Sequence, residues 1–148
     1  MSTTPTRITH LIGGTPWQGS AERTSPVFNP ATGEQTGQLD LASADLVGEV
    51  VTSAKDAWES SWQRASLTQR TQVLFRFREL LNERKGEIAE LITAEHGKVV
   101  SDALGEVTRG LEVAEFACGI PHLLKGGFSE NVSTKVDVYS IRQSLGVV

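Results

Sequence analysis

Three runs of apolar residues at helical spacing occupy the middle of the chain, and they constrain the fold more than any other feature. The first run follows Ser43, a typical N-cap residue, with Asp45 in the favoured first turn. The third covers residues 99–118 approximately and ends where a glycine and a proline interrupt the pattern. Both runs predict long amphipathic helices.

The second run is less regular than the other two. It begins at Ser66 or Thr68, is weakened at Gly86 and then resumes. Gly97 follows the last turn and can adopt the left-handed conformation of a C-cap. We therefore expect a single helix that continues through Gly86 and ends before Gly97.

The residues before the helices have the character of strands and turns. Residues 1–7 are polar and are expected to be loose. The stretch "ITHLIGGTPWQG" predicts a small hairpin with Trp17 on its return strand. An Asn-Pro step at 29–30 begins a turn that Gly33 can close with a positive φ, and "EQTGQLDL" predicts one more short strand.

The C-terminal stretch is rich in β-branched residues. Val132, Thr134, Val136 and Val138 alternate with polar positions, which predicts one half-exposed strand. The last four residues, "LGVV", resemble the start of a buried strand. From the residues alone we expect an α+β domain that forms part of something longer.

One charge stands out in the third helix. Val107, Leu111 and Ala114 form one apolar row, and Gly105, Arg109, Val113 and Phe116 form a second. A guanidinium keeps its charge when buried, so Arg109 needs an anionic partner. Glu106 and Glu112, each three residues away, offer an ordinary ion pair, which the spacing alone favours; the alternative is an anion that comes from outside.

Other candidate chemistry is sparse. Cys118, the single cysteine, excludes an internal disulfide, fits a reducing compartment and is expected to be a buried structural residue. His10, His96 and His122 match no metal-ligand spacing, so no metal site is expected. The phosphate-binding patterns G-x-G-x-x-G and G-x-x-x-x-G-K-[ST] are absent, so no cofactor-binding residue is assigned.

Composition bounds the partners and the compartment. A net charge of −4 gives no electrostatic reason to expect nucleic acid or an anionic membrane as a partner. The first residues do not look like a signal peptide, and no apolar run approaches membrane-spanning length. We expect a cytoplasmic location.

Four motifs together resemble the N-terminal part of an aldehyde dehydrogenase: "NPATGE" (29–34), "EHGK" (95–98), "DALGEVTRGLEVAEFACG" (102–119) and "SIRQSLGVV" (140–148). The third motif is similar to the CoA-acylating methylmalonate-semialdehyde dehydrogenases. The resemblance implies an α/β fold, with residues 8–131 as a partial NAD-binding domain, 132–144 as an oligomerisation strand and 145–148 as the start of the cofactor domain's core sheet. A homo-oligomer is implied for the full-length enzyme.

The same resemblance implies an activity. This subfamily oxidises malonate or methylmalonate semialdehyde with NAD and transfers the acyl group to coenzyme A, in valine and pyrimidine breakdown. Its nucleophilic cysteine, general-base glutamate and oxyanion-binding asparagine lie in segments that this chain does not match, and Cys118 does not take the nucleophile's place. No catalytic residue is therefore assigned, and the 148 residues alone are expected to be inactive.

One family residue is implied by the resemblance. The arginine of the "GEV-x-RG" motif, here Arg109, would help to hold the distal carboxylate of the substrate. A planar guanidinium can do so with two hydrogen bonds. Two alternatives remain: another carboxylate-binding aldehyde dehydrogenase, such as a succinate-semialdehyde type, or a non-enzymatic remnant that assembles through its C-terminal strand.

Overall fold

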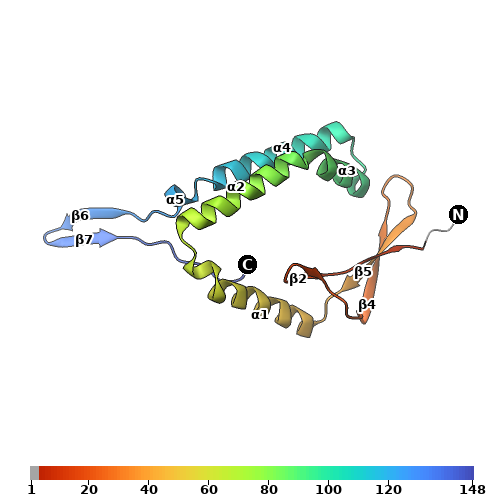
Figure 1. Ribbon diagram of the computed structural model, residues 1–148, viewed down its shortest axis with the longest axis horizontal. Coiled ribbons are helices and arrows are strands. Elements are labelled where there is room, and N and C mark those ends of the chain that lie inside the picture. Colours follow the sequence, from red (N-terminus) through yellow and green to blue (C-terminus); the bar gives the residue numbers. More distant parts are fainter. Residues whose placement is uncertain (1–3) are drawn as a thin grey trace.

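The computed structural model describes residues 4–148, which form an open ring from which a β-hairpin projects (Figure 1). A small sheet forms one end of the ring, and helix α1 (Ala44–Ser60) forms one side. Helices α2 (Leu67–Glu83), α3 (Lys85–His96) and α4 (Val100–Ala117) form the opposite side. The short helices η1 (Trp62–Arg64) and α5 (Ile120–Leu123) lie at the ends of α1 and α4.

The N-terminal sheet has three strands in the order β1-β5-β4. Strands β4 (Arg23–Phe28) and β5 (Gln35–Leu41) are antiparallel and are joined by the predicted turn, in which Gly33 has φ 74°. The Asn29 side chain accepts hydrogen bonds from two backbone amides of this turn, at Ala31 and Thr32. The predicted strand after the turn and the hairpin of β2 (Leu11–Ile12) with β3 (Thr15–Pro16) are confirmed, but Trp17 lies just after the return strand and not on it.

The expectation that residues 1–7 are loose is wrong for Thr6 and Arg7. Both belong to strand β1 (Thr6–Ile8), which pairs in parallel with β5. The Arg7 Nε donates to an oxygen of Asp40 at 2.8 Å, and only 5% of Asp40 is exposed. Backbone pairing and this ion pair give Thr6 and Arg7 a defined structure, although their polar surroundings in the sequence predicted a loose segment. Residues 1–3 of that segment lie outside the described residues.

Helices α1 and α2 begin where their capping residues predict. The Ser43 hydroxyl accepts a hydrogen bond from the Leu46 amide, and Ser66 forms a reciprocal capping box with Gln69. Gly97 ends α3 in the left-handed conformation, with φ 83°. The single second helix is a wrong prediction, because the chain turns at Arg84 and continues as α3.

That turn serves the packing of α3 against α4. Ala89 of α3 and Ala103 of α4 are fully buried, and Val107 lies beside them. Leu81, Ile88 and Ile92 pack around this cluster. Small residues let two helix backbones approach closely. Because the chain turns at Arg84, both α2 and α3 contact α4.

The C-terminal region is a hairpin, and the predicted single strand is wrong. Strands β6 (Phe128–Ser133) and β7 (Val136–Tyr139) are antiparallel, and the chain reverses at residues 134–135, where Lys135 has φ 61°. All residues of both strands are exposed. Residues 140–148 form no helix or strand, so the assignment of "LGVV" to a core sheet stays a prediction.

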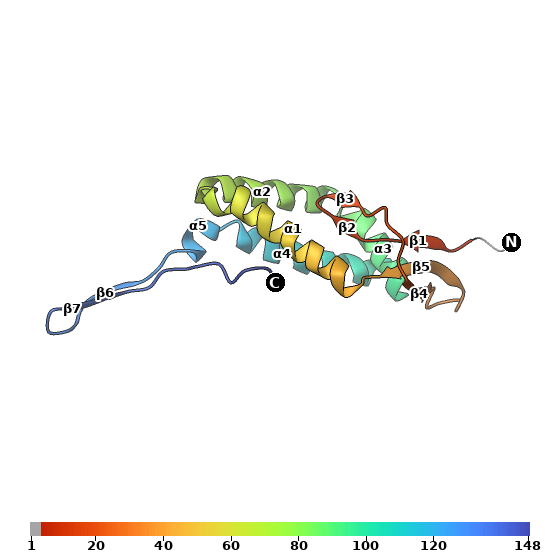
Figure 2. The same cartoon turned by 90° about the horizontal axis from the view of Figure 1, so that it is seen from below.

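The ring is closed by contact between two turns that are far apart in the sequence. A Cβ atom at Gly97 would lie 3.2 Å from Cγ of Pro30, so the β4–β5 turn touches the end of α3. Figure 2 shows the same end of the helices beside the sheet. The motifs "NPATGE" and "EHGK" therefore pack against each other.

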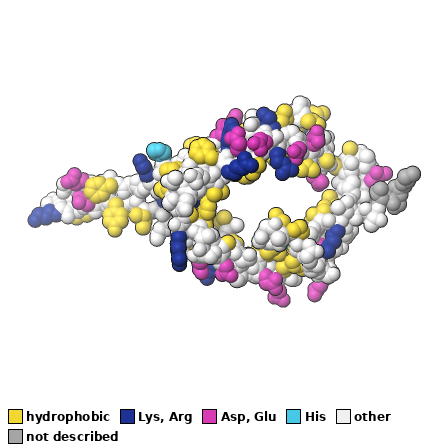
Figure 3. Space-filling model, viewed as in Figure 1, with side chains coloured by type: hydrophobic (Ala, Val, Ile, Leu, Met, Phe, Trp, Pro, Cys, Tyr) yellow, Lys and Arg dark blue, Asp and Glu magenta, His cyan; other side chains and the backbone are white. Residues whose placement is uncertain are grey.

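An opening passes through the molecule in the space-filling view (Figure 3). Hydrophobic side chains line much of its rim, and charged side chains gather on the side formed by α2 and α4. On α1 the exposed hydrophobic residues include Val47, Val50 and Val51, and on α2 they include Val73 and Phe77. These helices lack the cover that a complete core would give them.

Candidate functional site

Helix α4 carries the candidate site and has two different faces. One face is buried against α2 and α3, as the first apolar row predicted, and it consists of Ala103, Val107, Leu111 and Ala114. The second row is exposed: Val113 is 68% exposed and Phe116 is 70% exposed. The sequence expectation that Arg109 lies within a buried row is therefore wrong.

Arg109 lies on this exposed face and extends back along the helix. Its Nη1 atom is 3.7 Å from the point where a Cβ of Gly105 would stand. Long side chains on a helix lean toward its N-terminus, which explains this direction. Since Gly105 has no side chain, the guanidinium can lie over the helix surface one turn before its own Cα.

The predicted local ion pair of Arg109 is absent from the described residues 4–148. No carboxylate oxygen in that range lies within 4.0 Å of its guanidinium, although Glu106 and Glu112 stand three residues before and after it. The structure thus presents an exposed guanidinium that has room for an anion.

Glu106 is engaged by a different cation. Lys98, just after the end of α3, places its Nζ 2.5 Å from Oε1 of Glu106, and only 18% of the lysine side chain is exposed. The hydrogen bond from Lys98 lowers the pKa of Glu106 below its ordinary value, desolvation opposes this shift, and the more distant charge of Arg109 adds to it. Glu106 therefore stays ionised and bound to Lys98.

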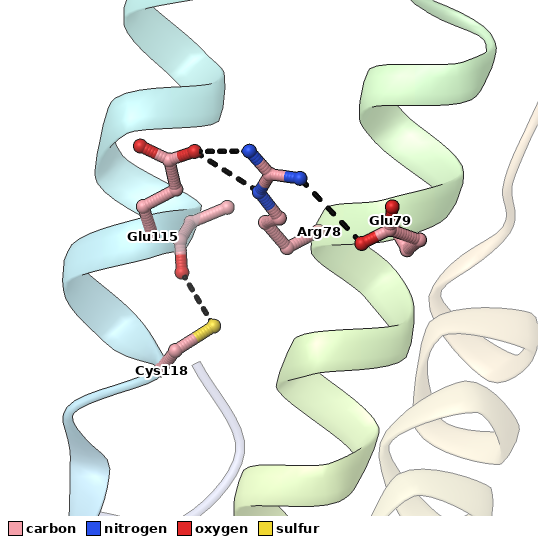
Figure 4. A network of polar contacts seen from close by, with 5 residues as sticks. Arg78, Glu79, Glu115 and Cys118 are labelled. Atoms are coloured by element: carbon pink, nitrogen blue, oxygen red, sulfur yellow. Dashed lines mark hydrogen bonds and ion pairs between the residues drawn. The ribbon is translucent and has the colours of Figure 1, made fainter.

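A second ion pair joins α4 to α2 (Figure 4). Arg78 donates from Nε and Nη2 to one oxygen of Glu115, at 3.0 and 2.6 Å, and it also contacts Glu79. The hydrogen bond to Glu115 is the largest cause that raises the pKa of Arg78. This pair fixes the helix that carries Arg109 against its neighbour.

Cys118 lies at the end of α4, where its Sγ is 3.3 Å from the carbonyl oxygen of Ala114 (Figure 4). The residue is 8% exposed, which confirms that it is a buried structural cysteine. Its position gives a substrate no access to the sulfur.

Sequence reasoning missed Lys98 as a neighbour of the site. The motif "EHGK" drew attention to the glycine, but the partner of the lysine lies eight residues away, across the turn between α3 and α4. The left-handed Gly97 makes that reversal possible. Helical spacing describes pairs within one helix, so no pattern within α4 could have revealed this contact.

Glycine turns and clusters of metal-binding side chains are the features that could hold a cofactor or a metal ion. Gly13, Gly14 and Gly33 have positive φ and lie in the turns of the β2–β3 and β4–β5 hairpins. Among residues 4–148 no group of three or more metal-binding side chains comes together. No helix in this range is long and apolar enough to cross a membrane.

Comparison with known proteins identifies relatives along nearly the whole chain. A model of the aldehyde dehydrogenase family matches residues 17–148. The malonate-semialdehyde dehydrogenase of Pseudomonas aeruginosa is 40% identical over 139 residues, which cover 94% of this chain and 28% of that protein. The mitochondrial acylating methylmalonate-semialdehyde dehydrogenase of Arabidopsis thaliana is 38% identical, over 97% of this chain and 23% of that protein.

Solved structures agree with the sequence matches. A protein of Sinorhizobium meliloti described as a methylmalonate-semialdehyde dehydrogenase, in complex with NAD, superposes with a TM-score of 0.85 at 39% identity, over 98% of this chain and 29% of that one. The methylmalonate-semialdehyde dehydrogenase of Oceanimonas doudoroffii gives a TM-score of 0.82 at 46% identity, over 92% of this chain and 28% of that one. The chain thus spans less than a third of the length of these relatives.

Proposed function

The chain belongs to the aldehyde dehydrogenase family, and we propose that it supplies the N-terminal part of an NAD-dependent, CoA-acylating dehydrogenase of malonate or methylmalonate semialdehyde. The fold corresponds to the N-terminal part of aldehyde dehydrogenases, and the relatives named above are malonate- and methylmalonate-semialdehyde dehydrogenases. The substrate is an aldehyde with a carboxylate at its other end.

One observation carries the substrate assignment: Arg109 is exposed and free of an ion pair within the described residues. Malonate and methylmalonate semialdehydes differ from simple aldehydes by one carboxylate. A guanidinium binds a carboxylate with two parallel hydrogen bonds, which gives both affinity and orientation. Arg109 would thus hold the carboxylate and direct the aldehyde carbon toward the reacting groups.

The proposed enzyme uses NAD and coenzyme A as well as the aldehyde. In the proposed enzyme NAD accepts hydride and coenzyme A accepts the acyl group. The one thiol of the described residues, Cys118, is buried, and we expect this chain to contribute substrate binding through Arg109 and part of the NAD-binding domain.

Replacement of Arg109 by leucine tests the proposal. The enzyme to use is a chimera in which these residues replace the matching segment of the Pseudomonas aeruginosa relative. We expect kcat/KM for malonate semialdehyde to fall at least about ten-fold relative to kcat/KM for propanal, since charged hydrogen bonds are worth about 1.5–3 kcal/mol. Steady-state rates of NADH formation with both aldehydes measure the ratio.

Arg76→Leu is the matched control for Arg109→Leu. Arg76 is an exposed arginine of α2 and makes no ion pair within residues 4–148, so its replacement removes the same charge elsewhere. The ratio of the two kcat/KM values should stay unchanged in this variant. Equal loss of both activities in Arg109→Leu would contradict a carboxylate-binding role.

Assembly and compartment are part of the same proposal. The hairpin β6–β7 projects from the ring with all its residues exposed, which supports assembly of the complete enzyme into a homo-oligomer through this hairpin. The single, reduced cysteine supports a cytoplasmic location. Light scattering of the chimera with and without a Val138→Lys change would test the assembly.

A further inference from the structure

Within residues 4–148 Arg109 makes no ion pair, although a carboxylate stands three residues before it on the same helix. Glu106 and Arg109 are neighbours on the helix surface, a spacing at which such side chains commonly pair. The Arg109 side chain extends back over Gly105, the residue next to Glu106 in the sequence. Another contact must therefore hold the Glu106 carboxylate away from the Arg109 guanidinium.

Lys98 is the group that competes for Glu106. Its Nζ is hydrogen bonded to Oε1 of Glu106; the lysine side chain is mostly buried, whereas 43% of the Glu106 side chain is exposed. Lys98 is held in place by the left-handed Gly97, which lies against Pro30 at the seam of the ring. The lysine thus reaches Glu106 from the turn between α3 and α4 rather than from α4 itself.

We propose that Lys98 is a positioning residue that holds the Glu106 carboxylate away from Arg109 and so leaves the guanidinium open to the substrate carboxylate. This inference rests on the proposed function of Arg109. Without Lys98, Glu106 turns to Arg109 and competes with the substrate, as an internal anion on the same helix. The consequence is a change in substrate affinity, with the chemical step unaffected.

Kinetics of the chimeric enzyme test this competition. In Lys98→Met, KM for malonate semialdehyde should rise about three- to six-fold while kcat changes little, which corresponds to the strength of an exposed ion pair. In Lys98→Met combined with Glu106→Gln, the competing charge is gone and KM should return to within about two-fold of the parent. Lys98→Arg should keep the parent KM.

Glu112→Gln is the matched control for Glu106→Gln. It removes the carboxylate that follows Arg109 by three residues. Glu112 makes no ion pair within residues 4–148. Combined with Lys98→Met, Glu112→Gln should leave KM raised. If Glu106→Gln fails to restore KM, or if Glu112→Gln restores it equally, the proposal is overturned.

A titration of the 148-residue chain gives a readout that needs no catalysis. We expect the pKa of Glu106, followed by NMR of its side-chain carboxyl carbon, to stay below its ordinary value in Lys98→Met because Arg109 replaces the lysine. It should rise to its ordinary value only when Arg109→Leu is added. A rise in Lys98→Met alone would overturn the proposal.

The two proposals fail in different ways. If Arg109→Leu lowers activity toward both aldehydes equally, the carboxylate-binding function is wrong whatever Glu106 does. If Arg109→Leu is selective but KM in Lys98→Met stays at the parent value, the function stands and the role of Lys98 is wrong.

Discussion

Asp40 is a buried carboxylate that holds the N-terminal strand in place. It accepts hydrogen bonds from Arg7 across the parallel β1–β5 pairing, and Arg7 in turn donates to the carbonyl oxygen of Gly19. The hydrogen bond from Arg7 is the largest cause that lowers the pKa of Asp40, against the opposing effect of desolvation. The ion pair therefore belongs to the folded state.

This shift predicts how stability depends on pH. A carboxylate with a lowered pKa stabilises the folded state at pH values above its ordinary pKa of about 3.9, and that stabilisation is lost as pH falls through the folded pKa. Asp40→Asn should lower the urea midpoint at pH 7 and reduce its fall between about pH 5 and pH 3. Circular dichroism during urea unfolding measures both effects.

Asp56→Asn is the control for the pH prediction. Asp56 is an exposed residue of α1 and makes no ion pair within the described part of the chain. Its replacement should leave the pH dependence of the midpoint as it is. If Asp40→Asn and Asp56→Asn behave alike, the Arg7–Asp40 pair does not contribute to stability.

At the scale of the elements, Gly97 is a position where only glycine fits well. Its φ of 83° is unfavourable for other residues, and a Cβ would stand 3.2 Å from Pro30. Gly97→Ala should lower the free energy of unfolding by about 1–2 kcal/mol, through backbone strain and displacement of the β4–β5 turn. Urea unfolding followed by circular dichroism gives the value.

Gly86→Ala is expected to have the opposite sign. Gly86 lies in the first turn of α3, and nothing stands within 4 Å of the place where its Cβ would be. Alanine should raise the free energy of unfolding by up to about 0.5–1 kcal/mol. Destabilisation by Gly86→Ala would contradict the expected gain in helix propensity at this open position.

Local signals of the sequence predicted the start of α1, the start of α2 and the end of α3. The caps at Ser43 and Ser66 and the left-handed Gly97 were visible because each depends on neighbouring residues. The turn at Arg84 was not, because it depends on the packing of Ala89 against Ala103. Strand β1 was missed for the same reason, since its partner β5 lies far along the chain.

The candidate site shows the same division. The resemblance pointed to Arg109, but spacing predicted a buried row and a local ion pair, and the structure has neither. Periodicity tells which residues share a face, while burial depends on what covers that face. Val113 and Phe116 are exposed because no other element of the described chain packs against them.

At the scale of the whole molecule, we expect a polypeptide of these 148 residues to show no aldehyde dehydrogenase activity. Its one thiol is buried beside the carbonyl of Ala114, so a substrate cannot reach it. The measurement is NAD reduction with malonate semialdehyde, with the chimeric enzyme as the positive control. Measurable NADH formation by the polypeptide alone would contradict the proposed division of labour.

The seam where Pro30 meets Gly97 has a consequence for the order of folding. Helices that follow one another in the sequence pack against each other through local contacts. Closure of the ring instead requires contact between two turns that are far apart in the sequence, and such non-local contacts form slowly. We expect refolding to show a fast phase for the helical side and a slower one for the seam. Gly97→Ala should slow the second phase and leave the rate of the first unchanged. Closure of the ring would then be observed as a separate kinetic phase of refolding.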